Sequence, residues 1–423
     1  MNKAKQKAEK HKDTFYKDST LYFTATIVST GLTFLTLPIF TRYLSPSDYG
    51  IIALFTTFGF VVAGILSMGL QSASYRFYFE LKHNINEYQN LNSSIILVLI
   101  LVFSIFGLII FYGSNWISSS LFSGKINDQL VFLSYISGCL EYLINYLIYL
   151  LTAQLRSKSY TILIIGRSLL KVSIALYFII YYSLTYLAFI YAILITQLLI
   201  TLILFIIKKN LFSLSFSKKL LYKSFKFSYP NVLRLIIGFI NTSFDKIMLT
   251  NFSGLSSVGY YSIAQKTAFS FKVFKDSIDK SWTPFFMNKG HENSSNSNIE
   301  IMERFYEIAF YYMAIGFTIT CFCEEFIKLL TTKEFHFAMY VIPLFIFYYI
   351  VGIYASISIP QIQFSGKTMY ILPATIVNVI TNIVLNILLI PIFGIFGAVF
   401  SLIIGTSLGN AVHLYFGFKL FPI

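Results

Sequence analysis

Long apolar stretches separated by short polar breaks fill the chain from residue 19 almost to its end. A helix needs about 20 mostly apolar residues to cross a bilayer, and each stretch is at least that long. Twelve apolar stretches can be distinguished, separated by breaks that contain charged residues, Gly, Pro, Asn or Ser. They lie near 19–41, 49–79, 91–113, 128–152, 160–182, 184–207, 226–250, 258–285, 305–330, 339–362, 369–392 and 394–418. The pattern predicts an all-α, polytopic membrane protein with about twelve transmembrane helices.

The composition agrees with this pattern. Hydrophobic residues make up 56% of the 423 residues, charged residues only 12%, and the mean hydropathy is +0.70. These values lie outside the range of soluble globular domains, so no sizeable soluble domain is expected. The three cysteines, Cys139, Cys321 and Cys323, fall within apolar runs. They predict neither a disulfide framework nor a zinc site.

The basic residues predict how the chain is oriented. Residues 1–18 are polar and carry six lysines, and the apolar run that follows is too long for a cleaved signal sequence. We therefore expect a basic cytoplasmic tail and a retained first helix. The connections on the opposite side hold only Arg42, Lys125 and Lys333. The positive-inside bias then places both termini of this multi-pass protein in the cytoplasm.

The two halves of the chain resemble each other. A shift of 209 residues lays residues 41–50 on residues 250–259, the same helix junction in each half. Six helices separate the copies, so both run in the same direction, which predicts two parallel six-helix lobes around a central cavity. The predicted parts are a tail (1–18), an N-lobe (19–207), a basic linker lying along anionic headgroups (208–225) and a C-lobe (226–423).

Motifs for enzymatic chemistry are missing from the sequence. Ser365-Gly366-Lys367-Thr368 is similar to the end of a phosphate loop, but Gln361 stands where that loop needs its first glycine. No HExxH, paired CxxC or GxSxG motif occurs. The sequence therefore predicts a transporter without a bound cofactor or metal, not an enzyme.

Basic residues at membrane depth are the candidate binding groups. A central Arg or Lys costs roughly 2.5–3.5 kcal/mol on insertion scales, so it needs a partner or a wet cavity. Arg167 and Lys171 lie four apart, share one helix face and cannot neutralise each other. Two adjacent cations favour an anionic ligand. The predicted substrate-binding residues are Arg167, Lys171, Arg234, Lys272, Lys275 and Arg76.

Two structural alternatives apply to these cations. Arg76 and Lys280, near cytoplasmic span ends, are placed to extend to the headgroups. The others are placed to form structural ion pairs with nearby acids. Candidates for coupling to an H⁺ or Na⁺ gradient are the acids Asp245, Asp276 and Glu141, together with Lys246, which follows Asp245 in the sequence.

A polar ridge marks the eleventh predicted span. Asn378, Asn382 and Asn386 recur at a four-residue spacing, which suits hydrogen bonds to sugar hydroxyls or to a neighbouring helix. Gly405 and Gly409 in the twelfth span form a GxxxG pair, which predicts a close helix contact.

Several segments resemble one family of membrane transporters. In the first half these are Leu37-Pro38-Ile39-Phe40-Thr41-Arg42-Tyr43-Leu44-Ser45-Pro46, Asp48-Tyr49-Gly50, and Gly69 through Arg76-Phe77-Tyr78. In the second half they are Asp245-Lys246-Ile247-Met248-Leu249, Val258-Gly259-Tyr260-Tyr261-Ser262, Trp282, Pro284, Gly366-Lys367-Thr368, and Asn382-Ile383-Val384-Leu385-Asn386 through Pro391, Gly394, Gly397 and Ala398. Together they resemble the O-antigen (Wzx-type) polysaccharide biosynthesis flippases of the multidrug/oligosaccharidyl-lipid/polysaccharide exporter superfamily.

The resemblance implies a function in lipopolysaccharide or similar polysaccharide biosynthesis. Such a flippase lies in the bacterial inner membrane and moves an undecaprenyl-diphosphate-linked oligosaccharide from the cytoplasmic to the outer leaflet by alternating access. Implied partners are membrane lipids, a polysaccharide polymerase and a chain-length regulator, and no nucleic acid. Asp245 and Lys246 match a position where the family carries a charged motif, whereas Lys272 and Lys275 match only the charged character of such cavities.

Three other functions remain open at this point. A cation-coupled drug exporter of the same fold predicts an acidic cavity, against the cationic surplus here. A non-transporting scaffold of a polysaccharide assembly complex predicts that mid-membrane charges are dispensable. A lipid II flippase usually carries two helices more than the twelve predicted.

Overall fold

The computed structural model describes residues 2–81, 83–154, 156–213, 215–292 and 295–422, and in these ranges it contains helices and no strand. This confirms the all-α prediction. The first half holds α1 (Asn2–Tyr43), α2 (Pro46–Leu66), α3 (Leu70–Leu81), α4 (Ile85–Phe122), α5 (Asp128–Ala153), α6 (Ser157–Tyr182), α7 (Tyr186–Lys208) and η1 (Lys209–Leu211). The second half holds α8 (Lys218–Ser253), α9 (Leu255–Glu292), α10 (Ser295–Cys321), α11 (Cys323–Leu330), η2 (Lys333–Tyr340), α12 (Ile342–Val351), α13 (Tyr354–Phe364), η3 (Thr368–Tyr370), α14 (Ile371–Phe393) and α15 (Ile395–Leu420).

Each of the twelve predicted spans falls mainly on helical chain. Among the described residues, nine segments are long and apolar enough to cross a membrane, which supports a multi-pass membrane protein. They correspond to nine of the twelve predicted spans. The other three, predicted at 226–250, 258–285 and 305–330, correspond to α8, α9 and α10, which carry too many charged or polar residues to belong to that set.

Three predicted spans are interrupted. The span predicted at 49–79 is two helices, because the chain adopts left-handed backbone at Met68 (φ 51°) and Gly69 (φ 67°) between α2 and α3. The span predicted at 305–330 divides at Phe322 into α10 and α11. The span predicted at 339–362 begins in η2 and divides at 352–353 into α12 and α13. Apolar residues flank each break, so hydropathy alone gives no sign of it.

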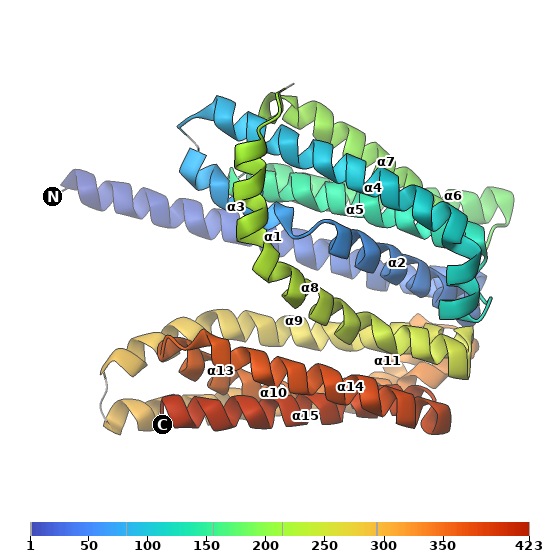
Figure 1. Ribbon diagram of the computed structural model, residues 1–423. Helices are drawn as coiled ribbons and strands as arrows, with labels where there is room; N and C mark the ends of the chain where they lie inside the picture. The colour runs from blue at the N-terminus through green and yellow to red at the C-terminus, as the bar shows by residue number, and fades with distance from the viewer. Residues whose placement is uncertain (1, 82, 155, 214, 293–294, 423) are drawn as a thin grey trace. The chain divides into compact units, whose positions relative to one another are not determined.

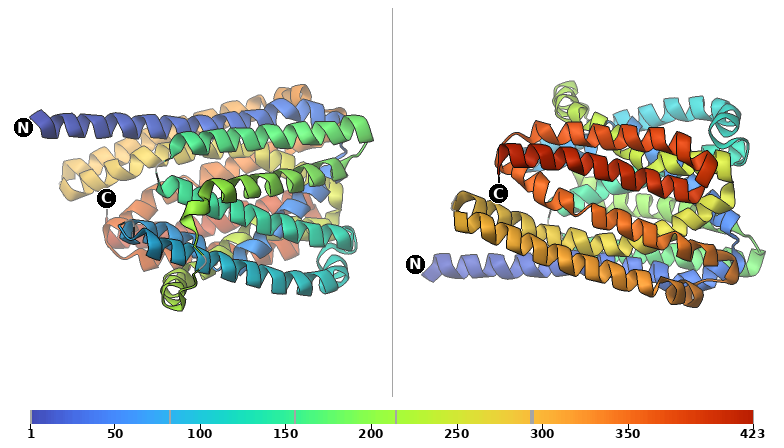
Figure 2. Two further views of the ribbon diagram at one scale, coloured as in Figure 1. Left: turned by 90° about the horizontal axis from the view of Figure 1, so that it is seen from above. Right: turned by 90° about the horizontal axis from the view of Figure 1, so that it is seen from below.

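The chain folds into two compact units. The first comprises Met1–Leu44 and Leu54–Phe239, and the second comprises Ser45–Ala53 and Ile240–Ile423. In the first unit α1 packs against α6, α4 against α5, and α7 against both α5 and α6 (Figures 1 and 2). In the second unit α15 packs against α12, α13 and α14, and α9 against α10 and α12. The predicted boundaries of the two lobes and the linker stay a prediction.

The repeated junctions meet each other inside the second unit. Ser47 in the first turn of α2 and Ser256 in the first turn of α9 are 209 residues apart, the shift that relates the two halves. Their hydroxyl oxygens lie 2.7 Å apart and share a hydrogen bond.

The helix backbones touch at the same crossing. A Cβ on Gly50 would lie 2.1 Å from the carbonyl oxygen of Leu255, and one on Gly259 would lie 1.9 Å from that of Pro46. The same shift of 209 relates Gly50 to Gly259 and Pro46 to Leu255. The two copies of the motif thus pack reciprocally, and the contact leaves no space for a side chain at either glycine.

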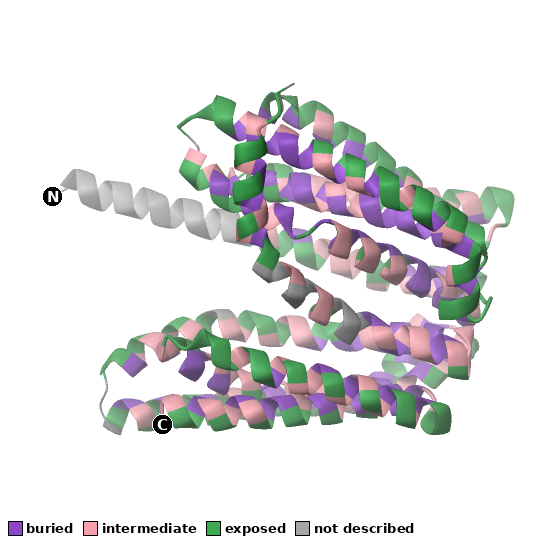
Figure 3. Ribbon diagram, in the orientation of Figure 1, coloured by how far each residue is buried: buried purple, intermediate pink, exposed green. Residues whose placement is uncertain are grey.

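Buried and exposed positions alternate along the helices (Figure 3). Many of the exposed positions on candidate spans are large and apolar, for example Leu108, Ile162 and Ile206. In water such surface would favour association, but on helices long enough to span a bilayer it is the surface that contacts lipid.

Candidate functional site

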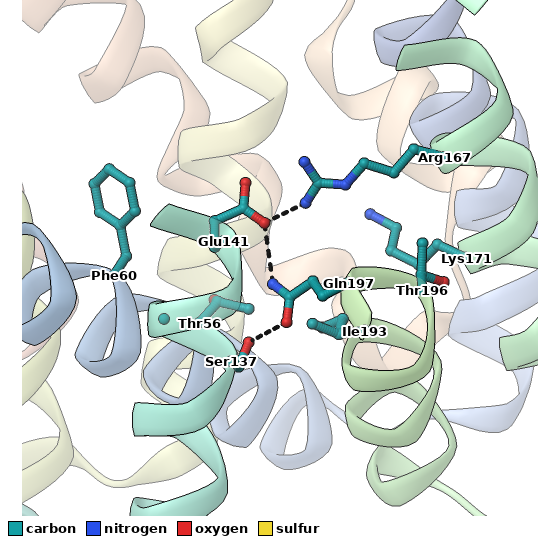
Figure 4. A pocket seen from close by; sticks show the side chains of 10 residues that line it. Thr56, Phe60, Ser137, Glu141, Arg167, Lys171, Ile193, Thr196 and Gln197 are labelled. Atoms are coloured by element: carbon teal, nitrogen blue, oxygen red, sulfur yellow. Dashed lines mark hydrogen bonds and ion pairs between the residues drawn. The ribbon is translucent and has the colours of Figure 1, made fainter. Parts of the chain in front are cut away.

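A cavity of about 280 Å³, lined mostly by polar residues, lies within the first unit among four membrane helices. Figure 4 shows the side chains of α2, α5, α6 and α7 that surround it. They are Thr56, Phe60, Ser137, Gly138, Glu141, Arg167, Lys171, Ile193, Thr196 and Gln197. The cavity contains two of the predicted binding cations together with one of the predicted coupling acids.

A glycine contact sets the distance between the α2 and α5 walls. A Cβ on Gly138 would lie 1.9 Å from the carbonyl oxygen of Gly59, and a Cβ on Gly59 would lie 2.0 Å from that of Ser134. The hydroxyl of Ser134 donates a hydrogen bond to the carbonyl of Phe55 across the same contact. These backbone approaches position Glu141, one turn further along α5, at the edge of the cavity.

The acid is held by donors from two other helices. The Arg167 guanidinium on α6 forms an ion pair with the Glu141 carboxylate. Gln197 on α7 donates to Glu141 Oε2 at 3.0 Å, and its own Oε1 accepts a hydrogen bond from Ser137 at 2.9 Å (Figure 4). The arginine therefore does not stand alone: its charge is balanced in this conformation by a carboxylate that lies on the cavity wall.

Because of Lys171, the cavity has an excess of positive charge. It lies one helical turn after Arg167 on the same face of α6 (Figure 4). Within the described part of the chain it forms no ion pair, although Glu141 is near enough to act on it electrostatically. The cavity therefore combines two cations with one anion. Thr196, which is 1% exposed, also borders the cavity, and its hydroxyl has no hydrogen-bond partner among the described residues.

A second polar cluster lies in the second unit, around Asp245 of α8. This carboxylate is 1% exposed. Tyr261 of α9 donates its hydroxyl to Oδ2 at 2.6 Å, and Asn386 of α14 donates its amide to Oδ1. Asn386 also donates to Asn382 Oδ1 at 3.2 Å, and both asparagines are fully buried. Of the three predicted ridge asparagines, Asn386 therefore binds the buried acid and Asn382 binds Asn386, and neither exposes surface to a sugar in this conformation.

The third ridge residue, Asn378, has a different role. It donates to Thr406 Oγ1 at 3.3 Å on α15. A Cβ on Gly405 would lie 2.9 Å from the Asn378 carbonyl oxygen, and one on Gly409 would lie 3.0 Å from Asn378 Cβ. The GxxxG pair thus packs α15 closely against α14, as its spacing predicts.

The remaining predicted cations lie outside both clusters. On α9, Lys272 pairs with Asp276 at 3.7 Å and Lys275 pairs with Asp279 at 2.5 Å, so acids on the same helix balance these two lysines.

Arg76 lies in an exposed group where α3 meets the start of α8. It pairs with Glu80 at 3.1 Å and lies over the ring of Phe227, 4.5 Å from its centroid. Lys246 is half-buried beside Asp245. The side chains of Arg234 and Lys280 lie outside the described residues.

Sequence reasoning missed the residues that complete the two clusters: Ser137, Thr196, Gln197 and Tyr261. The available signal was a polar pair, Thr196-Gln197, inside an otherwise apolar run. A buried amide in a membrane helix needs a partner, so such a pair points to a polar contact.

Comparisons with known proteins agree on the class of fold. The family model described as polysaccharide biosynthesis protein matches residues 15–288. The solved structure of the lipid II flippase MurJ, in an inward closed conformation, has a TM-score of 0.73 and 17% identity, covering 96% of this chain and 88% of that one. An inward-facing multidrug resistance MATE transporter of the MOP superfamily has a TM-score of 0.64 and 15% identity, covering 92% and 94%.

A further MOP-superfamily transporter, from Pyrococcus furiosus, has a TM-score of 0.57 and 15% identity, covering 95% of each chain; its description reports a binding pocket of reversed polarity. No curated protein sequence matches the chain. At these identities the solved structures show a shared transporter fold.

Proposed function

The chain belongs to the polysaccharide biosynthesis protein family, and on that premise we propose that it is a flippase for an undecaprenyl-diphosphate-linked oligosaccharide. The transporter fold supports this proposal, because the solved structures similar to this chain include a lipid II flippase. The direction we propose is from the cytoplasmic to the outer leaflet of a bacterial inner membrane, with both termini in the cytoplasm. An O-antigen or similar repeat unit would then pass to a polymerase and its chain-length regulator.

The observation that carries the proposal is the excess of positive charge in the cavity of the first unit. Arg167 and Lys171 face one carboxylate, Glu141, in a space walled by membrane helices. Charges interact far more strongly there than in water, so an unbalanced cation attracts an anion such as a diphosphate. Arg offers a planar pair of donors to phosphate oxygens, and Lys offers a mobile point charge. The polyprenyl tail can stay in the surrounding lipid.

Asp245 is the group that we propose for ion coupling. It is a buried carboxylate, and the buried Oδ1 of Asn386 beside it has no hydrogen-bond donor among the described residues. Carboxylate and amide oxygens are the ligands that hard cations prefer, and a carboxylate also accepts a proton. The residues present therefore fit either a sodium ion or a proton, held by Asp245 with Asn382 and Asn386. Such an ion would stabilise the buried negative charge.

The decisive experiment neutralises Lys171, which among the described residues has no ion-pair partner that the change would leave uncompensated. We expect Lys171→Gln to lower surface polysaccharide at least about tenfold in a strain that depends on this protein, since a charged hydrogen bond contributes about 1.5–3 kcal/mol. Lys171→Arg should retain most of it. Lys367→Gln, which removes an exposed lysine from the connection before α14, is the matched control. Protein levels in the membrane are measured in parallel.

The same variants separate the alternatives. A scaffold would tolerate Lys171→Gln, leaving polysaccharide unchanged at normal protein levels, and that result would refute the proposed role of the cavity. A drug exporter for cationic compounds would keep or gain efflux when the cavity loses a positive charge.

A further inference from the structure

The end of α7 buries a lysine for which the proposed transport cycle has no use. Lys208 is 3% exposed, and its ammonium donates to Gln154 Oε1 at 2.6 Å. This is its one hydrogen bond among the described residues, and no carboxylate pairs with it there. A lysine at a span end normally extends its ammonium into water and the headgroup region, whereas the Lys208 ammonium is turned to Gln154 and is shielded from water.

Among the described residues, the charged group that acts on Lys208 is a cation, Arg156. Gln154 follows the last residue of α5, and Arg156 precedes the first residue of α6. Arg156 is exposed and close enough to Lys208 to act on it electrostatically. Lys158 and Lys209 flank the pair in the sequence. From residue 142 to residue 244 the chain contains no Asp or Glu at all, so no neighbour in this stretch can balance them.

The start of α6 contributes a third attraction for an anion. This 26-residue helix has Arg156 at its N-cap, which supplies no side-chain hydrogen bond, and its first turn carries no acid. The first N–H groups of a helix lack partners within the helix and present a partial positive charge. Arg156 stands immediately before this turn, and its charge acts on the Lys208 ammonium.

A buried ammonium with one neutral acceptor is costly unless an anion completes it. We propose that Lys208, Arg156 and the first turn of α6 bind the phosphate group of an anionic membrane phospholipid. A lipid is the source because α5, α6 and α7 are all candidate membrane spans, and the site lies where α5 and α7 end and α6 begins, at one membrane surface. Basic pockets between membrane helices are known to suit such headgroups. The inference does not depend on which substrate is transported.

The test compares lipid binding by purified wild-type protein and Lys208→Met. Met keeps the length and apolar character of the side chain and removes the charge. The protein is reconstituted with phosphatidylglycerol or with phosphatidylcholine, and bound lipid and the melting temperature are measured. We expect wild type to prefer phosphatidylglycerol and to melt higher with it, whereas Lys208→Met should bind it about tenfold less tightly and lose the shift.

The controls separate this site from general surface charge. Lys208→Arg should keep the preference, and Lys419→Met, which removes an exposed lysine near the end of α15, should leave it intact. Without lipid, Lys208→Met should melt no lower than wild type, because it removes an uncompensated buried charge. An undiminished phosphatidylglycerol preference in Lys208→Met, or equal protection of wild type by inorganic phosphate, would overturn the assignment.

Discussion

Two fully buried tyrosines in the second unit differ in whether their hydroxyls have a partner. The Tyr261 hydroxyl donates to Asp245, whereas the Tyr312 hydroxyl has no hydrogen-bond partner among the described residues. We expect Tyr261→Phe to destabilise the protein by about 1.5–3 kcal/mol, because a buried carboxylate loses one of its donors. Tyr312→Phe should be neutral or slightly stabilising, since its ring keeps the stack with Phe271. Thermal unfolding in detergent measures both, and equal losses would contradict the prediction.

The ion pair in the first-unit cavity predicts a non-additive response. Arg167→Gln or Glu141→Gln alone leaves a half-buried charge without its partner, and each should lower the melting temperature. The double variant removes both charges and should recover a large part of that loss, with a coupling of about 1–3 kcal/mol. Thermal unfolding of the wild type, the two single variants and the double variant completes this double-mutant cycle. Additive losses would show that the pair is solvated and structurally unimportant.

At the scale of the element, the close approach of α2 and α5 gives a sharp prediction. Gly138→Ala places a Cβ where the Gly59 carbonyl oxygen already lies, so the helices must separate, at a cost of about 1–3 kcal/mol. Gly113→Ala on α4 is the matched control, because no atom lies within 4 Å of its Cβ position. Alanine there should be neutral or stabilising, since it favours helix. Melting temperatures in detergent compare the two, and a Gly138→Ala protein as stable as Gly113→Ala would contradict the proposed packing.

The helices themselves were predictable, but their breaks were not. Length and hydropathy locate each helix because lipid requires its backbone to be hydrogen-bonded internally. The break at Met68–Gly69 has apolar residues on both sides, and it depends on left-handed backbone that the sequence marks only by one glycine. Likewise, a charge at membrane depth predicts that a partner exists without saying which. Arg167 and Glu141 are 26 residues apart, and only helix packing shows that they pair.

At the scale of the whole molecule, the asparagine spacing and the shift of 209 residues each predicted one relationship between segments but not the contacts that those segments make. The four-residue spacing of Asn382 and Asn386 predicted a shared polar face, and the structure adds that this face binds Asp245. The shift of 209 predicted that the helix junctions are equivalent, but not that they touch. Lys208 was overlooked because a lysine at a span end resembles a headgroup anchor. Its burial is a tertiary property, set by how α7 packs against α5.

The contact between the repeated junctions allows a test of alternating access in the intact protein. Residues 46–53 of α2 belong to the second unit, while the rest of α2 belongs to the first, so the crossing with α9 lies close in the chain to the point where α2 passes from one unit to the other. With Cys139, Cys321 and Cys323 replaced by Ala, Ser47→Cys and Ser256→Cys should form a disulfide on oxidation, since the native hydroxyl oxygens are 2.7 Å apart. If transport requires these helix starts to separate, polysaccharide export should stop in the oxidised double variant and recover on reduction, with each single variant unaffected. Undiminished export by fully cross-linked protein would mean that the crossing stays closed throughout the cycle and that access changes elsewhere in the fold.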